Sequence, residues 1–234
     1  MKKNKNKVCF ITAVNDEVKY EECKFYINNL EIPEGIEIEF ISIRKAKSIT
    51  SAYNSAMNRT DARYKVYIHQ DTFIINKRFI YEILDLFENR KIAMIGVAGG
   101  RGIDSTGIWS KCSKVITRVY DTGDPGYIHL LSYGDIDEKY EKVDIIDGLI
   151  MITQYDVKWR EDIFKGWHFY DASQSREFIN RGYEIIVPRQ DNIWCIHDCG
   201  KVNMNMYEEN RKIFEGLYKG EYINLWLMIY QLMM

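Results

Sequence analysis

Short polar clusters directly follow four apolar, strand-like segments of the chain. They are Asn15–Asp16, Gln70–Asp71, Asp147–Gly148 and His197–Asp198. In an open α/β sheet, ligands bind beyond the carboxyl ends of the parallel strands. A turn explains any one cluster equally well, but four strand ends that each break into carboxylate, amide or imidazole groups favour a shared site. We therefore expect one polar rim that binds a metal ion and a diphosphate.

Asp71 is the residue of this rim whose type and position most clearly suggest a metal ligand. It ends an apolar segment that follows a helix-like segment bearing Asn54. A carboxylate is the hard oxygen ligand that Mg²⁺ or Mn²⁺ takes when it holds a diphosphate. The competing interpretation is that Asp71 only forms a turn at the strand end.

The segment WREDIFKGWHFYDASQSREF, residues 159–178, combines aromatic rings with ionisable groups. Rings stack on the apolar face of a pyranose, and carboxylates accept its hydroxyl protons. A carboxylate among rings also has the raised pKa that suits a general base. The alternative is an aromatic core cluster in which Asp171 or Ser173 caps a helix. The ionisable members are Glu161, Asp162, His168 and Asp171, beside Trp159, Phe164, Trp167, Phe169 and Tyr170.

Two other motifs give weaker indications of a binding site. Residues 195–199, CIHDC, contain zinc-ligand residue types, but alternate side chains of a strand stand roughly 6.6 Å apart. Two ligands of one Zn²⁺ lie within about 4 Å of each other, so we expect no zinc site there. The run Gly99–Gly100–Arg101–Gly102 lacks the spacing and the Lys–Ser/Thr pair of a phosphate loop.

Composition limits the class of protein. The 234 residues, 46% apolar and 28% charged, suit one sizeable core, and a formal charge of −2 gives no reason to expect nucleic acid as a partner. Five scattered cysteines argue against a disulfide framework and indicate a reducing cytoplasm. No secretory signal is expected, because Asn15, Asp16 and Glu17 interrupt the first apolar run.

The last residues, 219–234, form an apolar tail that is too short to span a bilayer. We expect it to be buried against the body of the fold or against a second copy of the chain, so that its removal lowers solubility. Attachment to a membrane surface is the alternative, which leaves open a membrane-associated cytoplasmic protein.

The order of predicted elements indicates the fold that must position these groups. Strands alternate with helices from Val8 to Ala98, which predicts an α/β domain with a Rossmann-like, mostly parallel sheet and flanking helices. The strands are expected at Val8–Val14, Ile36–Ile43, Tyr64–Ile68 and Ile92–Ala98, and the helices at Glu21–Leu30, after Ser48, and around Phe79–Phe87.

The second half is less regular. Residues 99–144 are glycine-rich and weakly patterned, so we expect a long loop that is functional or partly mobile. A strand at Val143–Thr153, interrupted by Asp147–Gly148, a short helix that ends near Phe178, two short strands and a closing helix at Met204–Tyr218 are predicted after it.

At these motifs the sequence resembles the GT-A glycosyltransferases of family 2, in particular a bacterial glycosyltransferase-like subgroup that includes a streptomycin-biosynthesis protein. The resemblance runs from Val8 to Cys199. ITAVND is similar to the first nucleotide-contacting segment, and ITSAYNSAMNRTDARYKVYIHQDTFI to the unit that ends in the DxD motif. The resemblance implies that Asp71 binds the metal ion and that the donor contacts Val14, Asn15, Asp16, Asn54, Gln70 and Asp71.

Three later segments extend the resemblance. DGLIMIT implies that Asp147 and Gly148 border the acceptor, and DIFKGWHFYD makes Asp171 the general base, with Trp167 and His168 on the acceptor side. IWCIHDCG implies that His197 completes the metal site. The motif at His69–Gln70–Asp71 lacks one of the two usual acids, and FISIRKAK lacks the acid that contacts the base, so the nucleotide is left open.

The resemblance implies a single-domain glycosyltransferase, residues 1–218, with a nucleotide-binding half of about 7–100 and an acceptor half of about 101–200. It would move a sugar from a nucleoside-diphosphate donor to a glycan, peptide or small molecule, with Mn²⁺ or Mg²⁺ on Asp71 and His197. Asp171 would deprotonate the acceptor hydroxyl, and a single displacement would invert the anomeric carbon.

Two other functions account for parts of the sequence. A non-catalytic nucleotide-sugar or glycan-binding module on the same fold is favoured by the incomplete DxD motif. A sugar nucleotidyltransferase needs a glycine-rich, basic loop after the first strand, where this chain has the acidic ITAVNDEVKYEE.

Overall fold

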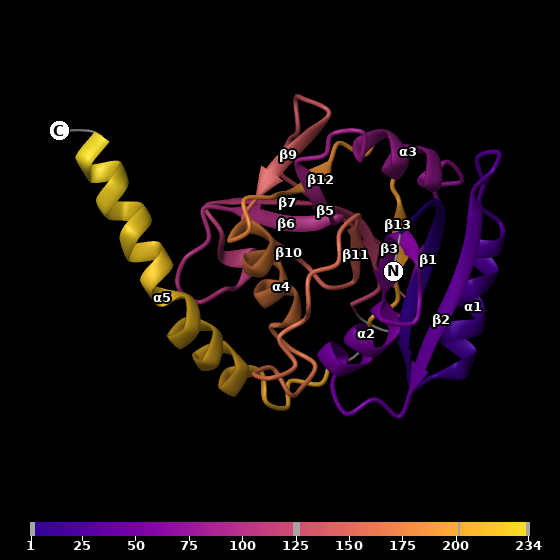
Figure 1. Cartoon of the computed structure of the whole chain (residues 1–234), viewed down its shortest axis with the longest axis horizontal. Coiled ribbons are helices and arrows are strands. Elements are labelled where there is room, and N and C mark those ends of the chain that lie inside the picture. The colour runs from indigo at the N-terminus through magenta and orange to yellow at the C-terminus, as the bar shows by residue number, and fades with distance from the viewer. Residues whose placement is uncertain (1–2, 124–126, 201, 233–234) are drawn as a thin grey trace.

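The computed structural model describes residues 3–123, 127–200 and 202–232, and side chains up to residue 219. A seven-stranded sheet forms its centre (Figure 1). Five of these strands (β2, β1, β3, β5 and β12) run in one direction, while β11 and β9 run in the other, which confirms the mostly parallel α/β prediction. In spatial order the strands are β2 (Glu37–Arg44), β1 (Asn4–Val14), β3 (Ala62–Ile68), β11 (Ile150–Thr153), β5 (Ile92–Ile95), β12 (Glu184–Pro188) and β9 (Tyr140–Val143).

Helices cover both faces of this sheet, which explains the continuous apolar run of β1. Val8 and Phe10 belong to the core on one face, with side chains of α1 and α3. Cys9 and Ile11 belong to the core on the other face, with side chains of α2 and α4. A strand that is buried on both faces shows no polar alternation. The helices are α1 (Glu17–Asn28), α2 (Ile49–Met57), α3 (Phe79–Leu86), α4 (Tyr170–Ile179) and α5 (Tyr207–Leu232).

Capping residues set the starts of the first two helices. Ser48 caps α2, as its place before the helical pattern predicts, and it also forms a capping box with Ser51. Asp16 caps α1, because its carboxylate accepts hydrogen bonds from the N–H groups of Val18 and Lys19. The helix therefore begins at Glu17, four residues earlier than its apolar residues alone predict.

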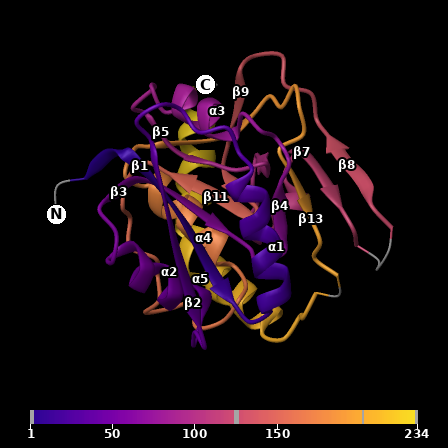
Figure 2. The ribbon, with the colours of Figure 1, turned by 90° about the vertical axis from the view of Figure 1, so that its right-hand side faces the viewer.

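The predicted long loop at residues 99–144 is wrong. Three strands of this segment, β6, β7 and β8, belong to a second, six-stranded sheet, which lies beside α1 in Figure 2. Glycines hid the strand pattern, because they are needed where strands approach closely: a Cβ at Gly99 would lie 2.4 Å from the Ile145 carbonyl oxygen. The strands are β10 (Ile145–Ile146), β6 (Ala98–Arg101), β7 (Lys114–Asp121), β13 (Cys195–His197) and β4 (Thr72–Ile74), with β8 (His129–Tyr133) paired to β7.

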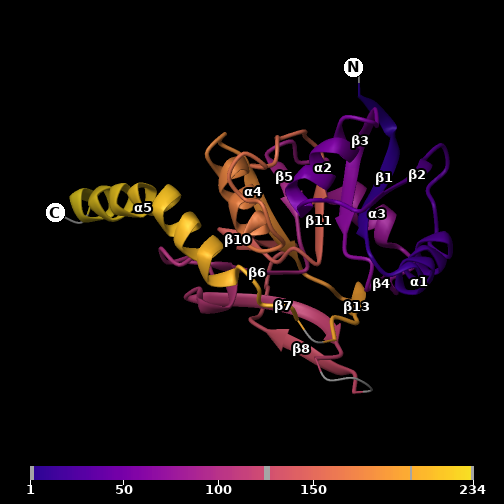
Figure 3. The same cartoon turned by 90° about the horizontal axis from the view of Figure 1, so that it is seen from below.

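Helix α5 begins against the body of the domain and runs away from both sheets (Figure 3). Phe214 and Tyr218 are buried against Phe169, and the Tyr218 hydroxyl donates to Glu177 of α4 at 3.1 Å. The predicted burial of the apolar tail concerns side chains 220–234, which lie outside the described residues. Within the described part of the chain, no helix combines the length and the apolarity needed to cross a bilayer.

We predict that Phe214→Ala lowers the free energy of unfolding by about 3–5 kcal/mol, because the fully buried ring leaves a cavity between α5 and α4. Urea denaturation measures this change. Leu217→Ala, on the same helix but 39% exposed, is the matched control and should cost less than about 1 kcal/mol. Equal effects would show that α5 is not packed through Phe214.

Candidate active site

The turn between β3 and β4 is tied to the loop after β1. The Gln70 side-chain oxygen accepts hydrogen bonds from the N–H groups of Asn15 and Asp16, at 2.8 and 2.9 Å, and the Gln70 amide donates to the Asn15 side chain. The structure therefore brings together two of the four polar clusters. Gln70 has its side-chain oxygen engaged within the protein, and Val14 is buried at the end of β1.

Asp71, His69 and His197 form a cluster that fits a divalent cation. Asp71 Oδ1 lies 4.0 Å from His69 Nδ1 and 3.9 Å from His197 Nε2, and all three ligand atoms lie within 4.8 Å of one another. Asp71 Oδ1 is buried and has no hydrogen-bond partner among the described residues. A buried acceptor without a partner costs free energy. A cation between these three groups would satisfy it.

Asp121 of β7 orients His197. Its Oδ2 lies 3.0 Å from His197 Nδ1, so a proton on Nδ1 leaves Nε2 directed toward Asp71. Burial alone would lower the pKa of His197, but the hydrogen bond to Asp121 and the charge of Asp71 raise it. The negative surroundings that favour an imidazolium also favour a bound cation, which would displace the proton.

Tyr170, at the start of α4, joins the cluster to the turn at Asp147–Gly148. Its hydroxyl lies 2.6 Å from His69 Nε2, and burial lowers the pKa of His69, which keeps that imidazole neutral and able to bind a cation. Gly148 makes room for the phenol, because a Cβ there would lie 1.9 Å from the Tyr170 hydroxyl oxygen. The absence of a side chain at Gly148 thus allows the Tyr170 ring to pack within the site.

Asp171 is held beside the same turn. Its carboxylate accepts hydrogen bonds from the N–H groups of Gly148, at 3.0 Å, and Ala172, at 2.8 Å. Burial, and after it the charge of Asp147, raises the pKa of Asp171 to about 7. Asp147 itself accepts a hydrogen bond from the Leu149 N–H and keeps partial solvent exposure. A carboxyl group with a pKa near 7 exchanges a proton readily at neutral pH.

Neither Asp171 nor Ser173 caps α4, so that part of the alternative is wrong, but its aromatic core cluster is confirmed, because Trp159, Phe164, Phe169 and Tyr170 are buried in the core. The N-cap of α4 is Phe169, which has a left-handed backbone with φ 61° and makes no side-chain capping hydrogen bond. Such a conformation is unfavourable for an aromatic residue and persists only where the surroundings impose it. Here it turns the chain so that Tyr170 and Asp171 enter the site.

Other predicted residues lie apart from this cluster. Asn54 is buried and hydrogen-bonds both the N–H and the C=O of Trp159, each at 2.9 Å, so its amide holds the polypeptide rather than facing the rim. Trp167 is 48% exposed. His168 lies 2.8 Å from the Asn203 carbonyl oxygen and packs on Tyr207 at the start of α5.

The sequence did not indicate His69, Tyr170 or Asp121 as members of the site. His69 occupies the position where the DxD motif has an acid, and this departure was its one available signal. Asp121 lies in the segment that was expected to be a loop, and no sequence pattern marks it.

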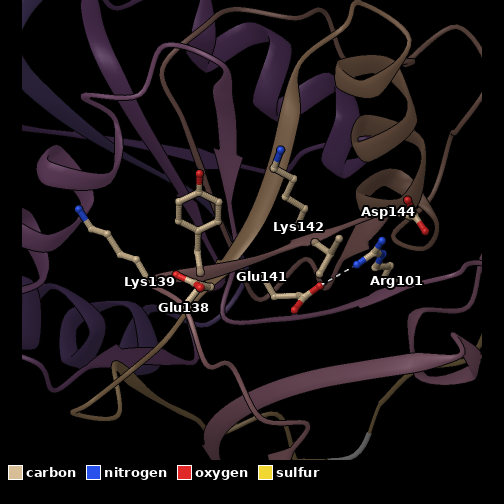
Figure 4. Close-up of a pocket in the computed structure, with 8 residues that line it drawn as sticks. Arg101, Glu138, Lys139, Glu141, Lys142 and Asp144 are labelled. Carbon is tan, nitrogen blue, oxygen red and sulfur yellow. Dashed lines mark hydrogen bonds and ion pairs between the residues drawn. The ribbon is translucent and has the colours of Figure 1, made fainter.

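The two described pockets lie away from the rim. One, of about 500 Å³, is lined by Arg101 and residues 138–144, and Figure 4 shows Arg101 directed at Glu141 across it. Lys114 also donates to Glu141, so ion pairs occupy much of its polar surface. The other, of about 450 Å³, lies near Arg160 and Glu177. Neither contains a residue of the cation cluster.

Comparisons with known proteins identify the family and the fold. The model of a family described as "Glycosyltransferase like family" matches residues 9–218. The structure is similar to the mannosyltransferase PcManGT from Pyrobaculum calidifontis in complex with GDP-Man and Mn²⁺, with a TM-score of 0.54 and 10% identity over 84% of this chain and 57% of that one. No curated protein sequence matches the chain significantly.

The TarS fragment 1–349 from S. aureus is similar too. Its complex with UDP has a TM-score of 0.52 and 10% identity over 92% of this chain and 64% of that one. Its complex with UDP-GlcNAc has the same score and identity over 84% and 60%. This chain spans less than two thirds of each of these structures, and at 10% identity the likeness shows a shared GT-A fold.

The raised pKa of Asp171 predicts how stability depends on pH. Its ordinary value is 3.8 and its folded value about 7, so the folded state binds this proton more tightly than the unfolded state. The free energy of unfolding therefore falls as pH rises from about 4 to about 7. Asp171→Asn removes this contribution, so its melting temperature relative to wild type should rise across that interval.

Thermal unfolding of both proteins at pH 4, 5.5, 7 and 8 would test this prediction. Asp162→Asn, an exposed carboxylate paired with Arg160, is the control, because Arg160 lowers the pKa of Asp162. A constant difference between Asp171→Asn and wild type at every pH would mean that Asp171 is not perturbed.

Proposed function

This chain belongs to the glycosyltransferase-like family whose model matches residues 9–218, and on that premise we propose that it transfers a sugar from a nucleoside-diphosphate donor to an acceptor hydroxyl. The observation that carries the proposal is that a cluster able to bind a cation and a carboxyl group able to accept a proton lie on one rim. One is the Asp71 oxygen without a partner between two imidazoles. The other is Asp171, a carboxyl group with a pKa of about 7.

We assign the cation to Asp71, His69 and His197. A bound divalent cation would neutralise the departing diphosphate as a Lewis acid. Two imidazoles favour Mn²⁺ over Mg²⁺, because Mg²⁺ takes oxygen ligands almost exclusively. The complexes of similar folds with GDP-Man and Mn²⁺ and with UDP-GlcNAc support a nucleoside-diphosphate sugar as the class of donor.

The loop after β1 is assigned to the donor. Gln70 fixes the backbone of Asn15 and Asp16 beside Asp71, which presents the end of β1 to a ligand on the cation. Val14 and the loop would contact the nucleotide, with Asn54 holding the Trp159 segment in place behind the rim.

Asp171 is assigned as the base. The two N–H groups that it accepts from fix its direction, and burial holds its pKa near 7, so it takes a proton from a hydroxyl without being permanently ionised. Attack by that hydroxyl in a single displacement would invert the anomeric carbon. Asp147, Gly148, the exposed Trp167 and the half-buried His168 would border the acceptor.

The first prediction of this proposal concerns the cation. Mn²⁺ should tighten the binding of UDP or GDP, and Asp71→Asn should weaken the Mn²⁺-dependent binding by at least about tenfold, because it removes the central oxygen ligand. Titration calorimetry with Mn²⁺ and with EDTA measures the effect. Asp191→Asn, a surface carboxylate that is 79% exposed, is the control. Equal nucleotide affinity with Mn²⁺ and with EDTA would contradict the assignment.

The second prediction concerns Asp171. Asp171→Asn should lower donor turnover by roughly 10²- to 10⁴-fold and leave nucleotide affinity unchanged, because it removes only the proton acceptor. In wild type, turnover should rise with pH through about 7, since the deprotonated form is active.

Release of nucleoside diphosphate from UDP-GlcNAc and GDP-mannose is the measurement, with Asp162→Asn as the matched control. Near-normal turnover in Asp171→Asn would exclude it as the base and make Asp147 the next residue to test. Tight nucleotide binding with no turnover in wild type would favour the non-catalytic binding module.

A further inference from the structure

His197 is shared by two groups of ligand atoms. Its Nε2 faces Asp71 and His69, the cluster described above. Its Nδ1 lies 3.0 Å from Asp121 Oδ2, and the other oxygen of that carboxylate, Oδ1, lies 3.7 Å from Cys199 Sγ. One ligand atom from each of Asp121, His197 and Cys199 lies within 4.8 Å of the others.

The 3.7 Å between Cys199 and Asp121 is the spacing of ligands around a tetrahedral zinc ion, and the 3.0 Å between Asp121 and His197 is a few tenths of an ångström shorter. With bonds of about 2.0–2.2 Å to nitrogen or oxygen and about 2.3 Å to sulfur, neighbouring ligand atoms are roughly 3.3–3.8 Å apart. A thiolate, an imidazole and a carboxylate form a donor set that Zn²⁺ takes, and the thiolate selects against Mg²⁺ and Mn²⁺. The group therefore differs in chemistry from the oxygen- and nitrogen-lined cluster around Asp71.

The tertiary structure removes the spacing argument against zinc in this segment. Strand β13 ends at His197, so the strand repeat no longer separates His197 from Cys199. Cys195 is buried in the core and is not part of the group. The third ligand comes from β7, which pairs in parallel with β13 and sets Asp121 opposite His197. The sequence-based exclusion of a zinc site was therefore incomplete.

Solvent access also singles out Cys199. The other four cysteines, Cys9, Cys23, Cys112 and Cys195, are buried, whereas Cys199 is partly exposed at the rim. A metal ion from solution can therefore reach this thiol.

We propose that Asp121, His197 and Cys199 form a second cation site that binds Zn²⁺, and that its occupation withdraws His197 from the Asp71 cluster. A neutral imidazole has a lone pair on only one ring nitrogen. When Nδ1 binds the ion, its proton moves to Nε2 and the thiol proton is released to solvent. Nε2–H then faces Asp71 and cannot bind a second cation. The site stands on its own geometry, whereas its effect on donor binding rests on the proposed function.

Cobalt absorption tests the site itself. Co²⁺ added to the metal-free protein should give the near-ultraviolet charge-transfer band of a cobalt–thiolate bond. Cys199→Ser should abolish this band, while Cys112→Ala, a buried thiol, and Asp71→Asn should keep it. Absence of the band in wild type, or its persistence in Cys199→Ser, would overturn the proposal.

Competition with Mn²⁺ tests the consequence. Free Mn²⁺, measured by electron paramagnetic resonance, should increase as Zn²⁺ is added to the Mn²⁺-loaded wild type. Zn²⁺ also competes with Mn²⁺ directly at Asp71. The measured quantity is therefore the Zn²⁺ concentration that releases half of the bound Mn²⁺. This concentration should be at least about tenfold higher in Cys199→Ser than in wild type. Equal half-release concentrations in Cys199→Ser and wild type would overturn the proposal that Zn²⁺ at the second site withdraws His197 from Asp71. Failure of the metal-free wild type to bind Mn²⁺ would count against the proposed function. In that case the cobalt absorption band would still show whether Asp121, His197 and Cys199 bind a metal ion.

Discussion

The placement of the His69–Asp71 turn is the constraint on which the rest of the site depends. This turn joins the two sheets, because β3 belongs to one and β4 to the other. Backbone hydrogen bonds hold it on both sides: the His69 N–H donates to the Leu149 carbonyl at 3.0 Å, and the Asp198 N–H donates to the Asp71 carbonyl at 2.8 Å. The start of β11 and the end of β13 are thereby fixed to the turn. Side chains from these distant segments of the sequence are therefore held next to one another by backbone hydrogen bonds.

Negative charge is concentrated around the two imidazoles of the site. Asp71 and Asp147 act electrostatically on both His69 and His197, and Asp121 acts on His197. Burial is the main cause of the raised pKa of Asp171, and the charge of Asp147 adds to it. Asp147 also opposes the burial that lowers the pKa of His69. One carboxylate thus links the proposed base electrostatically to the proposed cation ligands.

The same features are unfavourable for stability. The Asp71 oxygen lacks a partner among the described residues, Phe169 has a left-handed backbone, and Asp171 is a carboxyl group whose ionisation burial disfavours. Local conformations of this kind cluster at functional sites and persist because the surrounding core offsets their cost. The two apolar layers on either side of the central sheet supply that core here.

The sequence by itself determined the local elements and the residue types at strand ends. Apolar runs marked the strands of the first half, Ser48 marked the start of α2, and the polar residues after β1, β3 and β13 marked the rim. These signals are local, because they depend on periodicity and capping within a few residues. Tertiary structure alone decided which strands pair. Asp121 meets His197 across 76 residues, in a segment whose glycines and short strands show no periodicity. Pairing over such distances depends on the packing of whole sheets, which no local pattern encodes.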